Sequence, residues 1–272
     1  MGKTVELQLL EDARAGSGEA IELLLNRYEK QVYRFGLRMC GSEEDAKEVL
    51  QETLLAAFRG LRSFRGEAAL STWLFQVART QCMRLRRRPA GAPDTFESLE
   101  ASSQQPDEDA GPDVVSQARQ MGEVLQAAIL VLPEAYREVL VLRDVEGLST
   151  EEASDVVGIG ERALKSRLHR ARMELRGHLA TLMGEASPDA QGCPQLAEEL
   201  AKEAMEDVDQ ATCVRIDAHL ARCPRCADAC DQLKRTVSLC RQIPGDEVPR
   251  PVRLAVRRAV SGAVAMGGEL TA

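Results

Sequence analysis

Cysteine and histidine residues near the C-terminal end of the chain have the types and spacing that bind a metal ion. Six of the eight cysteines lie between Cys193 and Cys240, and a His-x3-Cys-x2-Cys-x3-Cys pattern begins at His219. At about 100° per residue, the side chains of this pattern would lie within ~60° of one another on a helix. Thiolates and imidazoles bind zinc, cadmium or copper ions rather than magnesium or calcium ions. The segment therefore predicts a soft-metal site.

The candidate ligands outnumber those that one tetrahedral zinc site needs. One interpretation is a single structural zinc ion with spare buried cysteines; the other is an exchangeable regulatory site with at least two ligation states. Pro224 favours a first helical turn, so one helix is expected to end near Cys223 and another to begin there. Cys40 and Cys82 are isolated and are predicted to be buried packing residues. The candidate ligands are Cys193, Cys213, His219, Cys223, Cys226, Cys230 and Cys240.

A helix-turn-helix pattern precedes this segment. A Ser-x-x-Glu capping box at Ser149 starts one helix, residues 157–160 form a tight turn, and a basic helix starts at Glu161. Its apolar residues recur at helical spacing, so the opposite face is either a solvated basic surface or a surface that donates to DNA bases and phosphates. The residues predicted to face DNA are Arg162, Lys165, Ser166, Arg167, His169, Arg170 and Arg172.

Another helical block occupies residues 17–88. Ser42 and Asp45 form the start of a capped helix, whose apolar residues recur at helical spacing as far as Leu61. After a loop around Gly66, a further helix opens at Ser71 and runs into a cluster of arginines. This block therefore buries an apolar core of its own.

Composition predicts an all-α fold, because aromatic residues are only 3% of the chain and strand-forming runs are scarce. The net charge is −8, but acidic and basic residues are strongly segregated along the chain. The net charge therefore does not exclude nucleic acid as a partner. We expect two small helical domains, the second a helix-turn-helix, joined by an acidic flexible linker and followed by a small helical Cys/His metal-binding domain. The expected boundaries are 1–88, 89–115 for the linker, 116–183, 188–243, and 244–272 for a tail.

Several classes of protein are not expected. The longest apolar run, residues 127–132, is too short to span a bilayer, and the N-terminus has no signal-peptide pattern. We therefore expect a cytoplasmic protein without a membrane partner. No glycine-rich phosphate loop, nucleophile elbow or pair of catalytic carboxylates occurs, so an enzyme is not expected either.

Two sets of motifs resemble the extracytoplasmic-function (ECF) sigma factors. LPEAYREVLVLRDVEGLS (132–149) and LKSRLHRAR (164–172) resemble the region that binds the promoter −35 element. DAKEVLQET (45–53) resembles the helix that binds the polymerase clamp, and FRGE, STWL and VAR (64–79) resemble the −10 recognition and melting segment. The resemblance implies polymerase contacts at Asp45, Glu48, Gln51 and Glu52, and −10 contacts at Phe64, Arg65, Ser71, Thr72, Trp73 and Arg79.

The cysteine-rich segment resembles the zinc-finger motif of zinc-associated anti-sigma domains. A sigma factor that carries such a domain resembles the CorE-like, metal-dependent ECF sigma factors. The implied function is to direct core RNA polymerase to promoter DNA and initiate transcription, with activity controlled by a Zn, Cd or Cu ion and no separate anti-sigma factor required. The alternatives are a thiol redox-sensing sigma factor and a stand-alone helix-turn-helix repressor.

Overall fold

The structure is a computed structural model that describes residues 3–61, 64, 66, 68–86, 112–182, 214, 217–241 and 248–265. Among these residues the regular structure is helical and no strand occurs, which confirms the predicted all-α class. Most of the predicted linker, residues 89–111, lies outside the described residues, as do the predicted site residues Arg65, Cys193 and Cys213.

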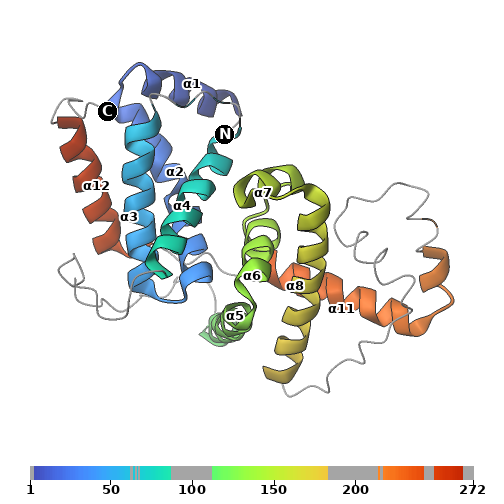
Figure 1. Ribbon diagram of the computed structural model, residues 1–272. Helices are drawn as coiled ribbons and strands as arrows, with labels where there is room; N and C mark the ends of the chain where they lie inside the picture. Colours follow the sequence, from blue (N-terminus) through green and yellow to red (C-terminus); the bar gives the residue numbers. More distant parts are fainter. Residues whose placement is uncertain are drawn as a thin grey trace. The chain divides into compact units, whose positions relative to one another are not determined.

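The first of two compact units comprises residues 1–110 and 245–272. In it α2 packs against α1, α3 and α4, and α12, from near the C-terminus, packs on α2 and α3 (Figure 1). The residues predicted to form a tail therefore contribute a helix to this unit. Its helices are α1 (Lys3–Arg14), α2 (Gly18–Cys40), α3 (Glu43–Gly60), α4 (Leu70–Arg86) and α12 (Arg250–Ala265).

Local signals explain where α2 and α3 begin and end. The hydroxyl of Ser42 accepts a hydrogen bond from the amide of Asp45 and caps α3, as predicted. Gly41 ends α2 with a φ of 86°, a left-handed conformation that glycine adopts without strain. On either side of this turn, α2 and α3 approach each other closely: a Cβ on Gly36 would lie 3.1 Å from the Cα of Ala46. Small residues thus let the two helices pack backbone to backbone.

The second unit comprises residues 111–244. α8 packs against α5, α6, α7 and α11, so it is the central helix of this unit (Figure 1). α5 begins at Pro112, so the helical region starts three residues before the predicted end of the linker at residue 115. The helices are α5 (Pro112–Val131), α6 (Glu134–Leu140), the π-helical segment η2 (Val141–Val145), α7 (Thr150–Val157), α8 (Glu161–Leu182) and α11 (Pro224–Arg241).

The predicted helix-turn-helix is present in α7 and α8. Ser149 and Glu152 form the complete capping box at the start of α7, and Gly158 ends α7 with a φ of 76°. The predicted apolar stripe of α8 is fully buried, with Leu164, Leu168, Ala171 and Leu175 all 0% exposed. Before this motif, α6 continues into the π turn η2, which the sequence analysis did not predict.

No helix among the described residues is both long enough and apolar enough to cross a membrane.

Candidate functional site

The outward face of α8 presents the cations that the sequence analysis assigned to DNA. Arg162, Ser166 and Arg170 are exposed. Lys165, Arg167 and His169 are half-buried beside them on the same helix. These donors lie opposite the buried leucine stripe, so the helix can seat its apolar side in the unit while donating hydrogen bonds to bases and phosphates.

Arg172 does not share this face, and its predicted outward orientation is wrong. The residue is 1% exposed, and its Nε and Nη2 atoms donate to the carboxylate of Asp144 at 2.8 and 2.6 Å. Asp144, in η2, is itself 1% exposed. The pair ties α8 to η2 inside the helix-turn-helix unit. Nothing in the local pattern around Asp144 distinguishes it from a surface carboxylate, so the sequence did not predict its role.

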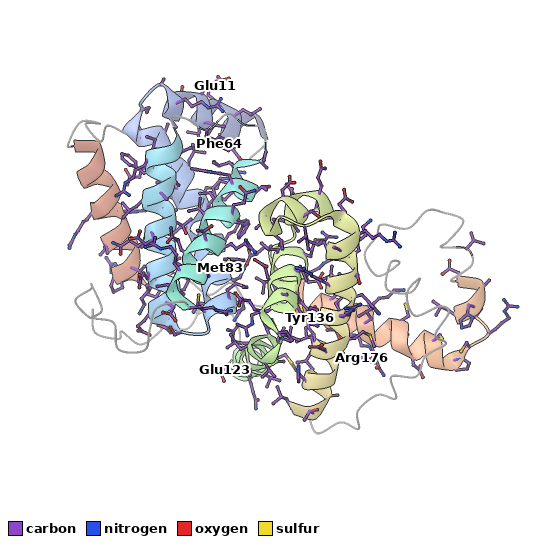
Figure 2. All side chains as sticks on the ribbon, viewed as in Figure 1. Glu11, Phe64, Met83, Glu123, Tyr136 and Arg176 are labelled. Carbon is purple, nitrogen blue, oxygen red and sulfur yellow. The ribbon has the colours of Figure 1, made fainter. Side chains whose placement is uncertain are left out.

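Phe64 and Trp73 come together in the first unit. Their ring centroids are 5.3 Å apart, and the guanidinium of Arg14 lies 5.8 Å from the centroid of Phe64. Arg14 also donates a hydrogen bond to the carbonyl of Phe64, which Figure 2 shows near α1. Both aromatic residues remain half-buried. The arrangement places a cation against aromatic surface, and general principles associate this combination with the binding of unstacked bases. Arg14 was not among the residues predicted from the sequence.

Other residues of the predicted −10 segment divide between core and surface. Phe75 is 2% exposed and its ring centroid is 5.4 Å from that of Phe35, so it packs in the core. Thr72 is 0% exposed, which is inconsistent with its predicted contact to DNA. Ser71 and Arg79 are half-buried. Only some members of this motif are therefore accessible to a nucleic acid strand.

The four polar residues of α3 that the resemblance assigned to polymerase lie outside its buried stripe. All four are half-buried: Asp45, Glu48, Gln51 and Glu52.

Three of the predicted metal ligands converge at the start of α11. One ligand atom each from His219, Cys223 and Cys226 lies within 4.8 Å of the others. The amide of Cys223 donates to the carbonyl of His219 at 2.9 Å, which folds the helical turn of residues 217–220 against the N-terminus of α11. A helix does end before Cys223 and another begins at Pro224, as predicted.

The donor set fits a zinc-like ion. The Nε2 atom of His219 is buried and has no hydrogen-bond partner among the described residues, so a ligand role would satisfy it. Cys223 lies directly before the first residue of α11, Pro224. Cys230 is buried beside Cys226, and Cys240 is buried near the end of α11; neither belongs to the converging group.

The helix α11 links this cluster to the helix-turn-helix, because it packs on both α8 and η2. Arg176 of α8, which Figure 2 labels, is 9% exposed, and burial lowers the pKa of its guanidinium. The cluster of His219, Cys223 and Cys226 and the helix α8 thus belong to the same compact unit, residues 111–244. The described residues of the predicted 116–183 and 188–243 domains both fall in this unit, and the boundary between the two domains stays a prediction.

Cys40 and Cys82, which the sequence analysis treated as isolated, contact each other. Their sulfur atoms are 3.3 Å apart and share a hydrogen bond between α2 and α4. This hydrogen bond, together with burial, raises the pKa of Cys82. The prediction that Cys82 is buried is confirmed, whereas Cys40 is half-buried.

Two family models match the chain in the order that the motifs predicted. Sigma-70 region 2 matches residues 24–91, and Sigma-70 region 4 matches residues 122–175. The first covers α3 and α4, and the second covers α6, η2, α7 and most of α8. The cysteine-rich segment lies outside both matches.

Curated relatives are similar over the same part of the chain. The sigma-H factor of Pseudomonas aeruginosa is 31% identical over 66% of this chain and 96% of its own length. The ECF sigma factor SigM of Mycobacterium tuberculosis is 32% identical over 66% of this chain and 85% of its own. SigE of Mycolicibacterium smegmatis is 32% identical over 61% of this chain, and the match spans 64% of that relative.

Among solved structures, CnrH in complex with the cytosolic domain of CnrY matches with a TM-score of 0.45 and 25% identity, over 65% of this chain and 97% of that one. A sigma factor RpoE in complex with the anti-sigma factor NepR, from Bartonella quintana, matches with a TM-score of 0.40 and 23% identity, over 67% and 96%. Sigma factors are transcription initiation factors and not enzymes. With both sigma-70 regions matched and relatives aligned over most of their length, the chain belongs to the ECF family of sigma-70 factors.

Proposed function

We propose that a soft metal ion, bound by the C-terminal Cys/His segment, controls the activity of this ECF sigma factor. The observation that supports the proposal is the convergence of His219, Cys223 and Cys226 at the N-terminus of α11, a helix that packs against α8. These three side chains would hold the ion, and the remaining cysteines of the segment are candidates for a fourth ligand. When bound, the ion would join the turn of residues 217–220 to the first turn of α11.

One helix, α11, connects this cluster to the helix that is proposed to bind promoter DNA. α11 packs on one side of α8, and the exposed cations Arg162 and Arg170 lie on another side of the same helix. A change in the packing of α11 therefore acts on the helix that is proposed to read the −35 element. Metal shifts the equilibrium between two arrangements of α11 only if one of these arrangements binds the metal more tightly. Zinc, cadmium and copper all suit the donors.

The remaining promoter and polymerase contacts complete the proposal. Phe64, Trp73 and Arg14 would bind unstacked bases of the −10 element, and the polar face of α3 would bind core polymerase. We also propose that the protein acts in the cytoplasm, where the polymerase is, and that its control requires no separate anti-sigma factor. Purification of this protein from its host, with identification of the proteins bound to it, tests the last point.

Run-off transcription with purified core RNA polymerase tests the metal control. The wild type, Cys223→Ser and the control Cys40→Ser are each titrated with zinc, cadmium and copper ions. We expect output from the wild type and from Cys40→Ser to change with at least one metal, and output from Cys223→Ser to stay constant. Equal output from the wild type under every metal condition would remove the metal control and leave the family assignment intact.

Thiol redox sensing is a second candidate, favoured by the packing of Cys223 and Leu220 against the buried pair Cys226 and Cys230. Oxidation of two such thiols by a peroxide would form one disulfide and reduce the peroxide to water, with loss of any thiolate ligands. Counting bound metal and free thiols before and after mild peroxide separates the two candidates. The stand-alone repressor is not proposed, because the chain matches sigma region 2 as well as region 4.

A further inference from the structure

The C-terminal helix α12 belongs to the first unit, although it is far in sequence from the other helices of that unit, which lie in residues 3–86. It packs on α2 and α3, and in Figure 1 it lies along one flank of α3 while α4 lies along the other. Val248, just before α12, and Val252, in its first turn, are 2% and 8% exposed. The helix is therefore docked through an apolar contact and not merely tethered nearby.

An ion pair marks the docking surface. Nε of Arg253 lies 3.5 Å from Oε1 of Glu29, whose side chain is 7% exposed. Arg257, one helical turn further along, also acts electrostatically on this carboxylate. Because Glu29 is buried, removal of its cationic neighbours would leave an uncompensated charge. The arginines of α12 thus contribute to docking as well as its valines.

Charge complementarity extends beyond this pair. α12 contains four arginines and no carboxylate. α3 contains five carboxylates, at positions 43, 44, 45, 48 and 52, against the two cations Lys47 and Arg59. A basic helix is therefore docked on an acidic one.

The helix α3 packs against α2, α4 and α12. The buried stripe of α3 includes Ala46, which meets Gly36 of α2. Asp45, Glu48, Gln51 and Glu52 lie outside this stripe, yet all of them are half-buried. Besides α2 and α4, the described helix that packs on α3 is α12. The docking surface of α12 and the residues that are proposed to bind core polymerase therefore share the helix α3.

We propose that α12 is a built-in competitor of core RNA polymerase: in the free protein it covers the α2–α3 surface around Glu29, and polymerase must displace it to bind. The inference rests on the proposed polymerase contact of α3. Because α12 is part of the same chain, its effective concentration at this surface is high, and a weak intrinsic contact suffices. A docked fraction of about nine-tenths weakens the apparent affinity for polymerase about tenfold.

The test compares full-length variants in equilibrium binding to purified core RNA polymerase. Arg253→Glu/Arg257→Glu places two carboxylates beside buried Glu29 and releases α12. The control Arg250→Glu/Arg258→Glu makes the same change in net charge at two exposed positions of α12. We expect the first variant to bind polymerase about tenfold more tightly than the wild type, and the control to stay within about twofold of it.

Hydrogen exchange of residues 250–265, measured with and without core polymerase, supplies a second readout. If α12 and core polymerase compete for the same surface, polymerase binding must release α12. The backbone amides of α12 then become less protected from hydrogen exchange. Equal affinities of the released variant and the wild type, or α12 protection that polymerase leaves unchanged, would overturn the inference while leaving the proposed polymerase contact standing. If no variant binds core polymerase, the proposed function fails instead, and the inference fails with it.

Discussion

Asp144 and Arg172 form a buried, two-point ion pair that joins η2 to α8, with nitrogen-to-oxygen distances of 2.8 and 2.6 Å. Both side chains are buried. The planar guanidinium suits this paired geometry, which a lysine could not reproduce. A cation that the local pattern assigned to DNA therefore belongs to the framework that holds α8 in place.

Loss of one partner of this pair is expected to destabilise the second unit. Arg172→Met leaves the carboxylate of Asp144 buried without its partner, at a cost of about 3–5 kcal/mol in the free energy of unfolding. Urea unfolding measures the effect. Arg170→Met, at an exposed position two residues earlier, should change stability by no more than about 0.5 kcal/mol. The pair has no such role if Asp144→Leu/Arg172→Met is no more stable than Arg172→Met alone.

The exposed cations of α8 are expected to act on DNA rather than on stability. Arg162→Ala and Arg170→Ala should each weaken binding to a promoter −35 duplex, because each removes a donor to bases or phosphates. A lost phosphate contact should also reduce the slope of log K against log salt by about 0.9. Fluorescence anisotropy at several salt concentrations measures both effects. Arg235→Ala, an exposed cation of α11, serves as the control, and an equal loss there would indicate a nonspecific charge effect.

Trp73 offers a direct probe of the −10 segment, because it is the one tryptophan of the chain. A Cβ on Gly60 would lie 2.8 Å from Cζ2 of Trp73, so Gly60→Ala must displace the indole ring. We expect a changed tryptophan emission spectrum and reduced promoter opening. Gly177→Ala in α8 is the matched control, since its Cβ would meet nothing within 4 Å. Identical emission from Gly60→Ala and the wild type would contradict the packing described for Trp73.

Glu29 is expected to make stability depend on pH. Burial raises its pKa above the ordinary value, and Arg253 and Arg257 offset this only in part. A raised pKa in the folded state means that ionisation opposes folding, so this group's contribution declines as pH rises from the ordinary glutamate pKa through the raised one. Glu29→Gln removes the ionisation. In urea unfolding, its stability relative to the wild type should therefore increase as the pH rises from the ordinary glutamate pKa through the raised one. A constant difference would show that Glu29 does not titrate this way.

Sequence alone predicted the elements that depend on neighbouring residues. Ser42 and Ser149 cap α3 and α7 because a hydroxyl three residues before an amide can satisfy it wherever the helix lies. The spacing of Leu164, Leu168 and Leu175 identified the buried side of α8, because helical periodicity is a local property. The motifs of the two sigma regions could be recognised for the same reason, because each lies within one short stretch of chain.

Tertiary structure decided which side chains remain available. Arg172 and Thr72 lie in motifs that resemble DNA-binding segments, but packing against η2 buries the first, and the core of the first unit buries the second. The contact between Cys40 and Cys82, and the docking of α12 beside Glu29, join residues that are distant in sequence. Such contacts depend on the burial and pairing of groups from several helices at once, and no local spacing encodes them.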